Sequence, residues 1–106
     1  MKKKKKSKSG RSGDAVIGVA WYRREQWGHL LQIAADREVL EDTYEEWKVT
    51  AEESLKKFAM PGYHLRKVDI DVEELLGWCN VHNRPVDGTA RSEFAAEKLR
   101  QKDEKD

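Results

Sequence analysis

The stretch AVIGVAWY at positions 15–22 constrains the fold most, because it is apolar at both alternating positions. That pattern and its β-branched residues are typical of a buried strand. Gly18 within it indicates a bulge or a close approach of another backbone. A two-stranded sheet is marginal alone, so helices must cover the strand or its edge must pair with another chain.

One further strand and four helices are expected after this strand. The half-exposed strand is predicted at about 63–71, and the helices at about 23–35, 43–59, 71–82 and 87–100. Thr43 with Glu46, and Asp71 with Glu74, have the spacing of capping boxes. The sequence therefore predicts a small, mostly helical α+β domain in the order β-α-α-β-α-α.

The charge is divided unevenly along the 106 residues. Residues 1–13 have a charge of +7 and no acidic side chain, and their basic residues are Lys2, Lys3, Lys4, Lys5, Lys6, Lys8 and Arg11. The other 93 residues hold 14 basic and all 20 acidic side chains, a net charge of −6. We expect a disordered basic tail over 1–13, a single domain over 14–100 and a frayed terminus over 101–106.

The single cysteine, Cys79, excludes an internal disulfide framework and favours a reducing cytoplasm. No apolar run is long enough to span a bilayer or to act as a secretory signal. Because two strands are marginal alone, a homodimer is expected to form through a strand edge or a helix face.

The stretch VAWYRREQW at 19–27 has two interpretations. As a nucleic-acid platform, its three aromatic rings would stack on bases while Arg23 and Arg24 held phosphates. As a strand-to-helix junction, Trp21 and Trp27 would point to the core and Tyr22 to the other strand face. The helical spacing of Trp27 and the negative body favour the junction, with Arg23 and Arg24 kept as candidate anion contacts.

Two groups of side chains suggest metal sites. Asp69, Asp71 and Glu73 form an acidic cluster at a strand end, where carboxylates can hold Mg²⁺, although Asp71 is also expected to cap a helix. Cys79 and His82 are three residues apart and resemble half of a zinc site. His29 and His64 are the remaining histidines, and no spacing completes either site. We therefore predict no catalytic residue, cofactor or bound metal.

The segments AWYRREQW, EDTYEEW, VDIDVEELLGW and RPVDGTARSEFAAEKL resemble small bacterial hypothetical proteins of unknown function. The resemblance covers roughly residues 15–100. It implies a bacterial cytoplasmic protein and brings no activity, ligand or site residue with it.

Three functions remain open from the sequence. The favoured one is a non-enzymatic protein-interaction or adaptor module, because the core is small and four tryptophans are available for an exposed patch. The second is a nucleic-acid-associated protein that uses the lysine-rich tail as a non-specific electrostatic anchor. The least favoured is a small metal-dependent enzyme centred on Asp69, Asp71 and His64.

Overall fold

The computed structural model describes residues 15–105. Its two strands, β1 (Ala15–Trp21) and β2 (Tyr63–Asp69), pair in parallel. The helices are α1 (Trp27–Ile33), α2 (Tyr44–Lys57), α3 (Val72–Val81) and α4 (Gly88–Lys105), with short 3-10 turns at Arg24–Gln26 and Arg37–Val39. The prediction of a small, mostly helical α+β domain is confirmed.

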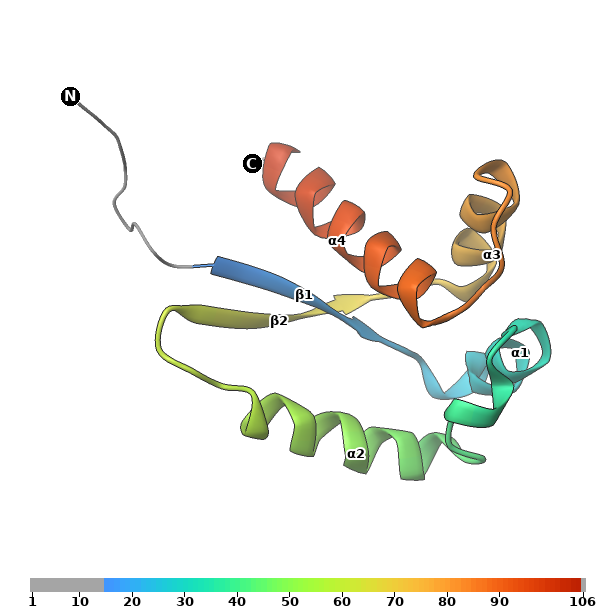
Figure 1. Cartoon of the computed structure of the whole chain (residues 1–106), viewed down its shortest axis with the longest axis horizontal. Coiled ribbons are helices and arrows are strands. Elements are labelled where there is room, and N and C mark those ends of the chain that lie inside the picture. The colour runs from blue at the N-terminus through green and yellow to red at the C-terminus, as the bar shows by residue number, and fades with distance from the viewer. Residues whose placement is uncertain (1–14, 106) are drawn as a thin grey trace.

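The two strands lie in a layer between α2 and α4, and α1 and α3 lie at the end of the molecule where the strands finish (Figure 1). A Cβ atom on Gly18 would lie 3.2 Å from the carbonyl oxygen of Ala95, so even-numbered residues of β1 face α4. The odd-numbered residues, such as Trp21, face α2, where the rings of Trp21 and Trp47 are 5.0 Å apart between centroids.

The predicted capping residues accept the hydrogen bonds expected at the starts of their helices. Thr43 Oγ1 accepts a hydrogen bond from the backbone N–H of Glu46, and the Glu46 carboxylate accepts one from the N–H of Thr43. Asp71 accepts from the N–H groups of Glu73 and Glu74 and starts α3. Asp87 accepts from the N–H of Ala90 at the start of α4.

The helix predicted at 23–35 is shorter in the structure. Residues 24–26 form a 3-10 turn, α1 begins at Trp27, and Ala34 is already extended, with ψ of 127°. The side chain of Gln26 accepts a hydrogen bond from the backbone N–H of Val72, which ties this turn to the start of α3. This contact between distant segments cannot be seen in a helical periodicity.

The core lies between α1, α3, α4 and the ends of the strands. Its buried apolar residues are Tyr22, Trp27, Leu30, Trp47, Ile70, Val72, Leu75, Cys79, Val86, Ala90, Phe94, Ala95 and Leu99. Trp47 is the only member from α2, so most of that helix lies outside the core. Within residues 15–105, every helix is too short or too polar to cross a bilayer.

Candidate functional site

One edge of β1 carries no neighbouring strand among the described residues. The N–H of Ala15 donates to the carbonyl of Gly62, and Trp21 O accepts from Ile70, so odd-numbered residues of β1 bond to β2. Because backbone groups alternate in direction along a strand, those of Val16, Gly18 and Ala20 point to the opposite edge. β1 has no charged residue and no proline, the usual features that protect an open edge.

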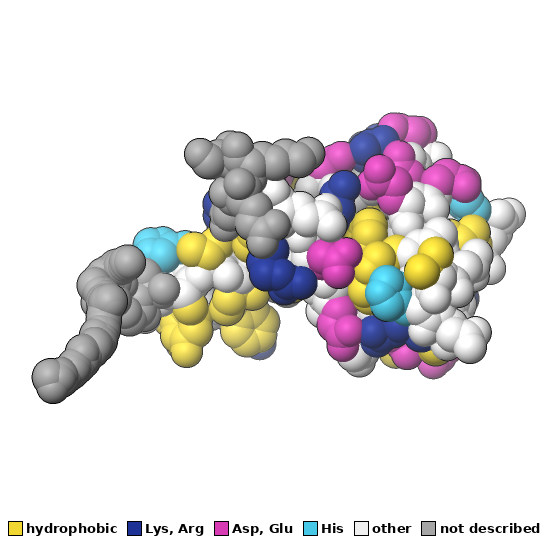
Figure 2. All heavy atoms as spheres, turned by 90° about the horizontal axis from the view of Figure 1, so that it is seen from above, with side chains coloured by type: hydrophobic (Ala, Val, Ile, Leu, Met, Phe, Trp, Pro, Cys, Tyr) yellow, Lys and Arg dark blue, Asp and Glu magenta, His cyan; other side chains and the backbone are white. Residues whose placement is uncertain are grey.

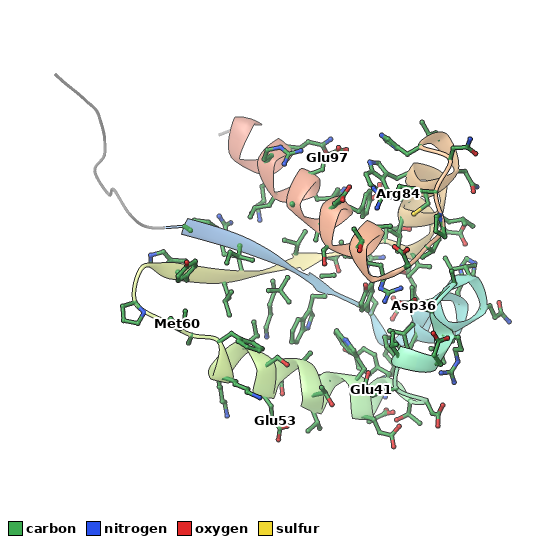
Figure 3. The ribbon with its side chains drawn as sticks, in the orientation of Figure 1. Asp36, Glu41, Glu53, Met60, Arg84 and Glu97 are labelled. Atoms are coloured by element: carbon green, nitrogen blue, oxygen red, sulfur yellow. The ribbon has the colours of Figure 1, made fainter. Side chains whose placement is uncertain are left out.

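A groove of about 580 Å³ lies between α2 and the sheet and is lined by residues of both strands. It is lined by Ile17, Val19, Ala20, Glu41, Trp47, Thr50, Ala51, Ser54, Leu55, Phe58, Met60, Tyr63 and Leu65. Glu41 and Met60 lie near the two ends of α2 and thus of the groove (Figure 3). At its mouth the side chains of Ile17, Phe58, Met60 and Tyr63 are exposed. The groove is therefore long and largely apolar, and β1 contributes Ile17, Val19 and Ala20 to its lining.

An aromatic cluster explains why α2 stands away from the sheet. Trp47 packs on Trp21, Tyr22 and Trp27, with ring centroids 5.0 to 5.4 Å apart, and these large rings fill the space near the start of α2. Toward the end of α2 no tryptophan fills this space, and Ala51, Leu55 and Phe58 line the groove instead. The apolar stripe predicted for α2 is therefore anchored at one end and lines the groove along the rest of its length.

A second hollow lies on the other face of the same edge. It has a volume of about 450 Å³ and is lined by Val16, Ile17, Gly18, Ser92, Ala96, Leu99 and Arg100. The small side chains of Ser92 and Ala96 leave this space where α4 passes β1. The open edge of β1 thus has an empty space on both faces.

The aromatic side chains of the stretch VAWYRREQW pack against other parts of the same chain. Trp27 and Tyr22 are buried, and Trp21 is partly covered beneath α2. Tyr22, expected on the opposite face from the core, enters it because β1 ends at Trp21 and the chain turns there. Burial raises the pKa of Tyr22 to about 12.

The candidate anion contacts Arg23 and Arg24 each have an acidic partner. Arg23 donates to both carboxylate oxygens of Asp69, at 2.6 and 3.2 Å. Arg24 pairs with Glu45 and lies over the ring of Tyr44. The seven basic residues of the predicted tail lie outside the described residues.

The candidate acidic cluster is divided among separate partners. The hydrogen bond from Arg23 lowers the pKa of Asp69. Asp71 caps α3, and Glu73 lies 3.0 Å from the ring nitrogen of His29. Within residues 15–105, no three His, Cys, Asp or Glu side chains are arranged to hold a metal ion.

Cys79 and His82, the candidate half of a zinc site, also have local contacts. Cys79 is buried, and burial raises the pKa of its thiol. Nδ1 of His82 lies 2.8 Å from the carbonyl oxygen of Trp78, one turn earlier in the chain.

The kinds of side chain on the surface differ between the two ends of the molecule (Figure 2). Acidic side chains gather over the end that holds α1 and α3, and apolar ones appear at the opposite end (Figure 2). A basic cleft of about 270 Å³ lies between β2 and α4, lined by Arg66, Lys67, Val68, Asp69, Lys98, Leu99, Gln101 and Lys102. Among the lining residues, Lys98 pairs with Glu74 at 3.0 Å, whereas the ammonium of Lys67 lies 4.3 Å from the ring centroid of Trp21, on the α2 face of the sheet.

Sequence reasoning missed one buried ion pair. Arg91 of α4 makes two hydrogen bonds of 2.8 Å to the carboxylate of Asp36, which also accepts from the N–H of Gly88. The bond from Arg91 is the main reason that the pKa of Asp36 is lowered. Arg91 lies three and four residues before Phe94 and Ala95, the spacing of the packed face of α4, and this position is the one signal in the sequence for its burial.

No protein-family model matches this sequence, and comparisons with curated proteins and with solved structures found no match. The site must therefore be interpreted from its own geometry.

Proposed function

We propose that this protein is a non-enzymatic protein-interaction module that binds an extended, apolar protein segment at the open edge of β1. The observation that carries the proposal is the position of this edge between the α2 groove and the α4 hollow. An added strand would direct alternate side chains into the two spaces. Its backbone would bond to Val16, Gly18 and Ala20.

The edge of β1 suits this role better than that of β2. β1 is uncharged, and its residues Val16 and Ile17 are 47% and 42% exposed. β2 carries Lys67 and Asp69 at its outer side, and charges on an edge oppose pairing with another strand. Bound apolar side chains would also cover the exposed stripe of α2, and burial of apolar surface favours association by about 25 cal/mol per Å².

Selection from a library of displayed nine-residue peptides tests this proposal. We expect the selected peptides to be apolar at both alternating positions, and their binding to be measurable by fluorescence anisotropy. Val16→Pro should abolish that binding, because the N–H of Val16 points away from β2 and proline there leaves the β1–β2 ladder intact.

Val49→Lys is the matched control, since Val49 is similarly exposed on α2 and does not line the groove. It should bind the peptides as the wild type does. Equal binding by the Val16→Pro variant would show that the edge is not the site.

A second function, non-specific binding of nucleic acid, is favoured by the basic cleft. The cleft is lined by Arg66 of β2 and by Lys98 and Lys102 of the last turns of α4. The C-terminal part of α4 lies over the start of β1, where the lysine-rich segment joins the described chain (Figure 1). Cations from both would act on the same phosphate backbone by releasing counterions.

Anisotropy of labelled duplex DNA and single-stranded RNA, at two salt concentrations, tests this second function. The full chain should bind, and salt should weaken the complex steeply. Serine at the seven basic positions of residues 1–13 should remove most of the affinity. As a control, serine at Lys48, Lys56 and Lys57 of α2 should leave it nearly unchanged. No binding by the wild-type chain at moderate salt would eliminate this function.

A further inference from the structure

We infer that the strand bound at this edge is β1 of a second copy, so that two chains form an antiparallel β1–β1 pair and one four-stranded sheet. The inference rests on the proposed function, because it names the segment that the open edge binds. The sheet order would be β2-β1-β1-β2. Both open β1 edges would then be paired at once by a twofold axis, as is usual for homodimers.

The apolar lining of the α2 groove and of the α4 hollow favours β1 as the bound segment. A strand placed beside β1 must be apolar on both faces, because the α2 groove and the α4 hollow are both lined largely by apolar side chains. β1 itself has that pattern over all seven of its residues. Residues 2–13 do not, since they are only lysine, serine, glycine and arginine.

The length of β1 also matches the length of the α2 groove. Seven residues of β1 span about 23 Å at 3.3 Å per residue. The 14 residues of α2, which form one wall of the groove, span about 21 Å at 1.5 Å per residue. A second β1 therefore fits along the whole groove.

The directions of the backbone groups define the register. Val16, Gly18 and Ala20 point their N–H and C=O groups to the free edge, so only even-numbered residues can form hydrogen-bonded pairs across it. The register that pairs all seven residues places Gly18 opposite Gly18 of the second copy. Val16 then lies opposite Ala20 on the α4 side, and Ile17 lies opposite Val19 on the groove side.

Dimerisation would stabilise the parallel sheet, because it would cover side chains of β1 that are exposed in the monomer. Parallel strands occur almost only in sheets that are protected on both faces, and two strands alone are marginal. In the dimer, the exposed side chains of Val16 and Ile17 become buried against the second copy. In the described monomer, α2 and α4 flank the sheet (Figure 1) but leave the side chains of Val16 and Ile17 exposed.

Light scattering and crosslinking of the full chain test the inference. At about 200 µM the wild type should have the mass of a dimer, and Val16→Lys and Val16→Pro should have the mass of a monomer. Val49→Lys, which places the same charge on a similarly exposed valine away from the edge, should remain a dimer.

Cysteine pairs test the register. Differently tagged Ile17→Cys and Val19→Cys chains, mixed and oxidised, should form a mixed disulfide dimer in high yield, because residues 17 and 19 face each other in a non-hydrogen-bonded pair. Either variant alone should crosslink at least fivefold less. Efficient crosslinking of one variant by itself would mean a register shifted by two residues and would overturn the proposed pairing. The wild type, with only the buried Cys79, is the background.

The outcomes separate the inference from the proposed function. A monomeric wild type that binds library peptides, with loss of binding in Val16→Pro, overturns the self-pairing and leaves the edge as a binding site for another protein. A monomeric wild type that binds no peptide overturns both. A dimer that persists in Val16→Pro overturns the self-pairing, because its interface lies elsewhere.

Discussion

At Gly18, the space available to a side chain is determined by α4. A Cβ atom there would lie 3.1 Å from a methyl group of Val68 and 3.2 Å from the carbonyl oxygen of Ala95. The backbone oxygen cannot rotate away as a side chain can. Glycine therefore allows β1 and α4 to pack closely, and this contact fixes one wall of the α4 hollow.

Gly18→Ala should lower the free energy of unfolding by about 1–3 kcal/mol, because α4 must move to admit the methyl group. Gly77→Ala in α3 is the control, since a Cβ atom there meets nothing within 4 Å. It should raise the free energy of unfolding by up to about 1 kcal/mol through helix propensity. Urea denaturation measures both, and a neutral Gly18→Ala would contradict the packing described.

Arg91 and Asp36 form the most buried ion pair described, with side-chain exposures of 9% and 20%. Burial lowers the pKa of Arg91, but the hydrogen bond to Asp36 and the nearby Tyr22, Asp36 and Asp87 together raise it overall. The pair joins the loop after α1, where Figure 3 labels Asp36, to the start of α4. Removal of either side chain would leave the other charge buried without an opposite charge beside it, which is destabilising.

Asp36→Asn should lower the free energy of unfolding at pH 7 by about 3 kcal/mol. The folded-state pKa of Asp36 is lowered, so its stabilisation is present above the unfolded-state value of about 3.9 and is lost as the pH falls below it. The variant should therefore lose less stability than the wild type between pH 5 and pH 2.5. Chemical denaturation at several pH values measures this difference.

Asp42→Asn is the control for the charge change. Asp42 pairs with Arg37 at 2.7 Å, and its side chain is 83% exposed. An exposed pair contributes at most about 1 kcal/mol. An equal loss in the Asp36 and Asp42 variants would show that burial does not make the Arg91 pair special.

At the level of the elements, α2 depends on its N-terminal end. Its only buried residue is Trp47, in the first turns, and Ala51, Leu55 and Phe58 line the open groove. The capping box at Thr43 and the aromatic cluster therefore hold a helix whose second half has little tertiary support.

Thr43→Ala should lower the free energy of unfolding by about 1 kcal/mol, because the backbone N–H of Glu46 loses its acceptor, the Thr43 hydroxyl, at the cap. Thr50→Ala, an exposed position in the middle of the same helix, should be neutral or slightly stabilising. Thermal and urea denaturation followed by circular dichroism compare the two. A larger loss for Thr50→Ala would contradict the role given to the cap.

Local signals in the sequence predict much of the fold. The capping residues Thr43, Asp71 and Asp87 and the apolar run of β1 locate elements correctly, because each depends on neighbours within a few residues. The interaction of Arg91 with Asp36 spans 55 residues and leaves no such pattern. The candidate site could not be predicted from the sequence either. The apolar stripe on α2 has the same periodicity whether it faces a closed core or an open groove.

For the whole molecule, the proposed dimer makes unfolding depend on concentration. The midpoint of thermal unfolding should rise by roughly 5 °C when the wild-type chain is concentrated from 2 to 200 µM, because pairing stabilises only the folded chain. Val16→Pro should show the same midpoint at both concentrations. Scanning calorimetry or circular dichroism measures the shift, and a concentration-independent wild type would contradict the dimer.

The parallel pairing of β1 and β2 also has a consequence for biosynthesis. Ala15 pairs with Tyr63, so a growing chain exposes β1 until α1, α2 and β2 have all been made. During that interval an uncharged apolar strand is free to join others of its kind on neighbouring ribosomes. The run of lysines just before it places like charges beside every such strand, and flanking charges of this type are known to slow aggregation. Replacing those lysines should therefore reduce the soluble yield during synthesis.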